Sequence, residues 1–218
     1  MRKFALAVVL GIGCLCAGNI YAQEFPQLHL GDTWRFRQTI DAPSKSPVIA
    51  ISPSYTLEYK NKSGDFILAT KSGSNNGINY AGRLIGPVSP KTCLYDVTAN
   101  AGFSKNCDVK LENGKSWSID ESNTIARTQE TVKIGPVEAV EVPAGRYMAT
   151  KIVSNKTITE FAFNGVPEPT GGYAKKFVTT YWYCPDVKAM VKIIRETSNA
   201  NGIISIKTDE LESYSGGM

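Results

Sequence analysis

Apolar and polar residues alternate along much of this chain with a period of two. In residues 32–40 (DTWRFRQTI), Trp34 and Phe36 fall on one side and two arginines on the other. Residues 55–59 (YTLEY) alternate in the same way, and residues 65–70 (DFILAT) follow a Lys-Ser-Gly turn. A period of two with aromatic and β-branched residues is typical of half-buried strands. These segments are therefore predicted to be β-strands.

The second half of the chain contains longer strand-like segments separated by turn residues. These segments are residues 124–134, 137–142, 146–163, 176–183, 189–197 and 203–211. Asn-Gly pairs, which suit tight hairpins because both central residues of a type I′ turn need positive φ, begin at residues 76, 113, 164 and 201. Short connections predict an all-β fold, a curved antiparallel meander sheet or an incomplete barrel with few or no helices. The best helical candidate is residues 43–51.

The N-terminal 22 residues have the pattern of a cleavable bacterial signal peptide. A positive start (MRK) precedes an apolar run over residues 4–18, and Ala22 ends the segment. The run is shorter than the ~20 residues a spanning helix needs. We expect cleavage after Ala22 and a periplasmic or secreted protein, with residues 23–218 forming one β-rich domain whose tail frays from about Ser213. Lipidation of Cys14 or Cys16 is the alternative.

Three cysteines remain after cleavage, and an oxidising compartment lets disulfides persist. Cys93 and Cys107 flank a loop of turn-forming residues and are the expected pair. Closing such a loop would stabilise the fold by roughly 3 kcal/mol. Cys184 is left over, either buried and inert or paired between chains. No metal site is expected, because the cysteine spacings match no zinc pattern and the single histidine, His29, is distant in sequence.

The charge of the mature chain is close to balanced. The signal carries two of the 24 Lys and Arg residues and none of the 20 Asp and Glu residues, which leaves 22 basic against 20 acidic residues. The charges are interspersed, without the basic stripe of a nucleic-acid-binding protein. We therefore expect no nucleic-acid partner and, after signal cleavage, no segment within the membrane.

Three motifs carry a resemblance to known proteins. They are residues 31–36 (GDTWRF), 142–147 (VPAGRY) and 181–187 (YWYCPDV). In order and spacing they resemble exported bacterial β-proteins of uncharacterised domain families, with G-x-x-W-x-[FY], V-P-A-G-[TR]-[FY] and Y-W-Y-x-P-x-V motifs. The resemblance covers most of the mature chain and implies an antiparallel β fold, without any assigned activity. Many members have Gly after the last valine, where this chain has Lys188.

No arrangement of residues points to catalysis or to a cofactor. A serine or cysteine nucleophile needs a base, and His29 stands alone in a Leu-His-Leu segment. Gly114, Lys115 and Ser116 supply only the end of a phosphate-binding loop, and the segment that follows is predicted to be a strand rather than a helix. Catalytic residues and cofactors are therefore both predicted to be none, and a hydrolase is only the third hypothesis.

Abundant amphipathic aromatics favour a binding role. Curved sheets and barrel mouths offer concave, largely apolar sites. The candidate ligand-lining residues are Trp117, Tyr147, Tyr181 and Tyr183. Trp182 is expected on the face of the strand opposite Tyr181 and Tyr183. The leading hypothesis is a non-catalytic exported protein that binds an apolar or amphipathic ligand, such as a lipid. The alternative is a structural or protein-interaction module of the cell envelope.

Overall fold

The computed structural model describes most of the chain beyond its N-terminal segment. The described residues are 28–42, 45–60, 62–70, 73–75, 78–80, 83–88, 95–96, 101–102, 111–123, 126–160 and 173–217. The predicted signal peptide and the predicted disulfide partners, Cys93 and Cys107, lie outside these residues.

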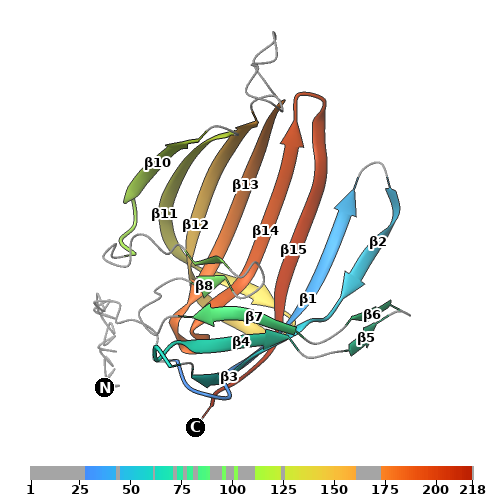
Figure 1. Cartoon of the computed structure of the whole chain (residues 1–218), viewed down its shortest axis with the longest axis vertical. Coiled ribbons are helices and arrows are strands. Elements are labelled where there is room, and N and C mark those ends of the chain that lie inside the picture. The colour runs from blue at the N-terminus through green and yellow to red at the C-terminus, as the bar shows by residue number, and fades with distance from the viewer. Residues whose placement is uncertain are drawn as a thin grey trace, which may run out of the picture.

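Within the described residues the structure is almost entirely β-strand (Figure 1). The strands are β1 Thr33–Ala42, β2 Lys45–Ile51, β3 Ser54–Lys60, β4 Phe66–Thr70, β5 Gly73–Asn75, β6 Ile78–Tyr80, β7 Arg83–Val88, β8 Tyr95–Asp96, β9 Ala101–Gly102, β10 Ser116–Ser122, β11 Ala126–Val142, β12 Gly145–Glu160, β13 Tyr173–Cys184, β14 Ala189–Asn199 and β15 Gly202–Ser215. One short 3-10 helix, η1 (Pro185–Val187), joins β13 to β14. No helix among the described residues is long and apolar enough to cross a membrane.

Eleven strands form one open antiparallel sheet in the order β10-β11-β12-β13-β14-β15-β1-β3-β4-β7, with β2 also paired to β1. Strands β10 to β15 form a meander, and β1 and β15, the first and last of the described strands, lie side by side. The expected all-β fold with a curved antiparallel sheet is confirmed (Figure 1). The helix considered for residues 43–51 is wrong, because Lys45–Ile51 forms β2 against β1.

Two apolar clusters lie on opposite faces of this sheet, because successive residues of a strand point to opposite sides. The base core joins buried residues of β1, β3 and β4 to those of β11–β15: Trp34, Phe36, Tyr55, Leu57, Phe66, Leu68, Val140, Ala149, Cys184, Val187, Ala189, Val191 and Leu211. The aromatic cluster gathers Val132, Ile134, Ile152, Tyr183, Met190 and Ile193, with Leu111, Trp117 and Tyr181 packed at its border.

A bulge in β11 lets the far end of the β11–β12 hairpin bend towards the base core. The register shifts between Ile134 and Val137, around Gly135. A Cβ at Gly135 would lie 3.3 Å from the Lys151 Cβ, so the strands approach closely there. At the end of the hairpin, the Ala144 N–H donates to the Leu211 carbonyl on β15 at 2.9 Å. The bend therefore ties the hairpin to a strand three places away in the sheet.

The C-terminal tail is more ordered than the sequence predicts. Ser213, Tyr214 and Ser215 continue β15 and pair with the start of β1. The ring of Tyr214 also stacks on Trp34, with centroids 5.8 Å apart. The expectation of fraying from about Ser213 is therefore wrong, because the N-terminal strand supplies both a hydrogen-bonding edge and an aromatic contact.

Candidate functional site

Three of the four predicted ligand-lining residues meet in the aromatic cluster. Trp117 on β10 lies opposite Val132, and Tyr181 on β13 lies between Ile152 and Ile193. Tyr183 lies one pair of residues further along β13 on the same face. Direct cross-strand partners share a face of a sheet. The successive pairing of the strands from β10 through β14 therefore builds a continuous apolar surface from residues that lie far apart in sequence.

The cluster is closed at its centre and more open at its border. The three isoleucines, at positions 134, 152 and 193, have no exposed surface, and Tyr183 is 1% exposed, whereas Trp117 and Tyr181 are half-buried. Fully burying a side chain of this size contributes about 1.5–3 kcal/mol. The centre therefore supports the fold, and the two half-buried aromatics are the members that can still bury surface against another molecule.

The hydroxyl of Tyr183 has no hydrogen-bond partner among the described residues, although it is shut off from water. Burial, together with the charge of the nearby Cys184 thiolate form, raises the pKa of Tyr183 well above its ordinary value. The phenol therefore stays protonated at neutral pH. It is a hydrogen-bond donor and acceptor among uncharged and mostly apolar neighbours.

A buried polar group borders the cluster on the same face. Asp209 on β15 lies opposite Ile193 and has no exposed surface. It forms an ion pair with Arg195 and accepts a hydrogen bond from Gln38 Nε2 at 2.6 Å. Lys207 Nζ lies 3.9 Å away. The apolar surface therefore ends at Asp209, a buried carboxylate whose charge is paired with basic side chains.

The fourth candidate, Tyr147, lies elsewhere. It packs against the base core, opposite Val140, and its hydroxyl donates to the Ala144 carbonyl at 3.4 Å. Its odd position on β12 places it on the face opposite Ile152. Cys184 is a free, buried thiol in the same core, and burial raises its pKa. The structure thus brings Tyr147 and Cys184 together, but away from the aromatic cluster.

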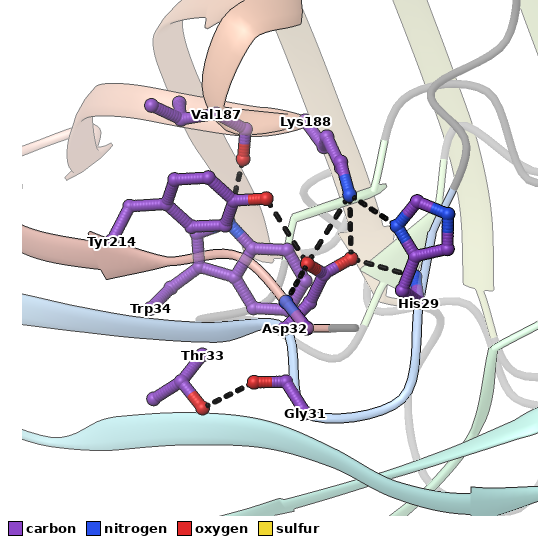
Figure 2. Close-up of polar contacts among 9 residues, drawn as sticks. His29, Gly31, Asp32, Thr33, Trp34, Val187, Lys188 and Tyr214 are labelled. Atoms are coloured by element: carbon purple, nitrogen blue, oxygen red, sulfur yellow. Dashed lines mark hydrogen bonds and ion pairs between the residues drawn. The ribbon is translucent and has the colours of Figure 1, made fainter.

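A second polar site, the Asp32 clamp, joins the two ends of the domain (Figure 2). The Asp32 carboxylate has no exposed surface. It accepts hydrogen bonds from the backbone N–H groups of His29 and Gly217 at 2.7 and 2.8 Å, and from the Tyr214 hydroxyl at 3.0 Å. Lys188 Nζ donates to both carboxylate oxygens at 3.0 and 3.2 Å. One carboxylate therefore holds the segment before β1, the end of β15 and the turn after η1.

Burial alone would raise the pKa of Asp32, but its four hydrogen-bonding partners outweigh this effect and hold the pKa below the ordinary value. Burial, together with the charge of the Asp32 carboxylate to which its hydroxyl donates, raises the pKa of Tyr214 well above its usual range. Asp32 is therefore ionised at neutral pH and saturated with donors. Such a carboxylate stabilises structure, and little of its capacity is left to act as a base.

Lys188 adopts an unusual backbone conformation to reach this carboxylate. With φ 57° it is the non-glycine residue in the left-handed region among those described. Its amine also lies 2.9 Å from His29 Nδ1, and the neighbouring Val187 carbonyl accepts from Trp34 Nε1 at 2.7 Å (Figure 2). Lys188 is therefore the counter-ion of a buried aspartate.

Sequence reasoning did not find the Asp32 clamp. It treated His29 as isolated and did not single out Asp32, although the unexpected Lys188 was the signal that could have suggested an acidic partner. No group of three or more His, Cys, Asp or Glu residues that could hold a metal ion occurs in the described ranges.

No family model matches the chain, and no curated protein matches it. Two solved structures are similar in part. One is a "putative exported protein with YmcC-like fold" from Bacteroides fragilis NCTC 9343, with 14% identity, a TM-score of 0.44, and coverage of 88% of this chain and 98% of that one. The other is a "putative lipoprotein" from Parabacteroides distasonis ATCC 8503, with 14% identity, a TM-score of 0.40, and coverage of 88% and 97%.

Proposed function

We propose that this protein is exported and binds an apolar or amphipathic ligand at the aromatic cluster without catalysing a reaction. The observation that carries the proposal is the convergence of Trp117, Tyr181 and Tyr183 on one face of the sheet. Binding sites for small apolar molecules are lined by aromatic and aliphatic side chains with a few polar groups. Here the Tyr183 hydroxyl is the candidate for such a polar group.

The environment of the polar residues supports binding rather than catalysis. The buried carboxylates, Asp32 and Asp209, are each held by several donors. A general base needs a free lone pair within reach of a substrate proton. His29, the single histidine, contacts Lys188 beside the Asp32 clamp rather than a serine or cysteine.

Native mass spectrometry tests the proposal. The full chain is expressed in a bacterium, and the exported protein is purified without detergent, then measured before and after exposure to a bacterial lipid extract. We expect the mass of a mature chain that begins at Gln23, together with a reproducible lipid adduct. Trp117→Ala should weaken the adduct, whereas Val178→Ala, at an exposed position of β13 on the face opposite Tyr181, should not.

Protein that stays empty in both preparations would contradict ligand binding. A reproducible protein partner in cross-linking experiments in cells, without any lipid adduct, would instead favour an interaction module of the cell envelope.

A further inference from the structure

The Tyr183 hydroxyl is a polar atom that the described part of the fold does not use. Tyr183 is 1% exposed, its hydroxyl is buried, and no described residue pairs with this hydroxyl. Most buried polar side-chain atoms in proteins have a partner, and each one left unpaired costs about 1–3 kcal/mol. Phenylalanine would fill nearly the same space without this cost. No described residue supplies this partner, which leaves the hydroxyl able to pair with a bound molecule.

The surroundings define the chemistry of that partner. The neighbours of Tyr183 are uncharged: Ile134, Ile152 and Met190 pack in the same cluster, and buried Thr150 is its direct cross-strand partner on β12. An ionised group here would lose its hydration without gaining a counter-ion, which is strongly unfavourable. The basic residues Arg195 and Lys207 lie further along the strands and are engaged at Asp209. The partner must therefore be uncharged.

The hydroxyl also fixes the direction of the hydrogen bond. A phenol that stays protonated donates its proton to an oxygen acceptor. A neutral carbonyl oxygen is the simplest acceptor that brings no further donors needing partners of their own. The apolar body of the same molecule would then extend towards Tyr181 and Trp117, the half-buried border of the aromatic cluster.

We infer that the ligand is an uncharged lipid-like molecule that enters past the half-buried border of the aromatic cluster, displaces the side chains that enclose the Tyr183 hydroxyl, and accepts a hydrogen bond from it through a carbonyl oxygen. This inference rests on the proposed function and narrows it to a class: esters, ketones or quinone-like molecules with an apolar chain or ring, rather than free fatty acids or hydrocarbons. A net hydrogen bond of this kind contributes about 5- to 10-fold in affinity.

Two probes of matched shape test the inference. 2-Decanone carries a carbonyl oxygen, and decane lacks it. Dissociation constants for delipidated protein are measured by tryptophan fluorescence for the wild type, for Tyr183→Phe and for the control Tyr147→Phe. Tyr147 is a suitable control because its hydroxyl lies in the base core and already has a partner, the Ala144 carbonyl.

We expect the wild type and Tyr147→Phe to prefer 2-decanone over decane by about 5- to 10-fold, and Tyr183→Phe to lose this preference. Unliganded Tyr183→Phe should melt at the same temperature as the wild type or higher, because it removes an unpaired polar atom. This readout shows that the variant folds.

The outcomes separate the inference from the proposed function. If the protein binds both probes with an unchanged preference in Tyr183→Phe, the inference is wrong and the binding function stands. If neither probe binds and native mass spectrometry finds the protein empty, both fail.

Discussion

Replacing Lys188 with glycine sets two opposing effects against each other. Glycine adopts the left-handed backbone conformation of this position without strain, whereas the same conformation costs a non-glycine residue roughly 1–2 kcal/mol. It also removes the counter-ion of Asp32. Breaking a buried ion pair by removing one partner costs about 3–5 kcal/mol. Asp32 keeps three other hydrogen bonds, so the lower end, about 3 kcal/mol, applies. The net expectation is a loss of about 2 kcal/mol in the free energy of unfolding.

Urea denaturation at pH 7, followed by tryptophan fluorescence, measures this loss. A slope of about 2 kcal/mol/M for a domain of this size converts it into a midpoint lower by about 1 M. Lys188→Met is the matched variant, because it keeps the strained backbone and removes only the charge. It should be less stable than Lys188→Gly by about 1 kcal/mol. A glycine variant at least as stable as the wild type would refute the counter-ion role.

The pH dependence gives an independent check. The pKa of Asp32 lies below its ordinary value of 3.8 in the folded protein. A carboxyl group with a lowered pKa adds stability that is fully present above its unfolded pKa and is lost as the pH falls through its folded pKa. The wild type should therefore lose stability as the pH drops below about 4. In Lys188→Gly the Asp32 carboxylate lacks its counter-ion, so its pKa is lowered less and this acid-dependent loss of stability should be smaller.

Three further expectations concern other parts of the structure. Truncation before Ser213 removes two of the groups that donate to Asp32 and should lower the melting temperature by several degrees in differential scanning fluorimetry; no change would mean that the tail adds nothing to stability. Cys184 should resist maleimide labelling in native protein and react in urea, as read from the mass of its peptide. Asp209→Asn should cost about 3 kcal/mol in urea denaturation, because it leaves Arg195 without its buried partner; a neutral result would contradict the ion pair.

The strands themselves could be predicted from the sequence because their alternation is local. The strands containing Trp34, Phe66 and Tyr181 follow directly from the period of two. Register could not be predicted, because it depends on bulges such as the one between Ile134 and Val137. The mistaken helix over residues 43–51 has a similar origin, since a short ambiguous segment takes its structure from the strand beside it.

The candidate site was predictable in part for the same reason. Tyr181 and Tyr183 are two apart on one strand, so a shared face follows from the sequence. Trp117 joins them only through two intervening strands, which requires the pairing of β10 with β11. Tyr147 could not be grouped correctly, because the register of β12 against β13 decides which face of β12 meets Tyr181. The Asp32 clamp joins residues up to 185 positions apart, a distance that no local pattern reveals.

The pairing of β1 with β15 has a consequence for the timing of folding. Tyr214 and Asp32, which meet at this joint, are separated by 182 positions in the sequence. The edge of β1 and the charge of Asp32 must therefore wait until nearly the whole chain has emerged. Contacts of such long range form slowly, because a large loop must close first. Until β15 is made, β1 therefore keeps an unpaired hydrogen-bonding edge, whereas the sequence-adjacent strands of the β10–β15 meander can pair without it.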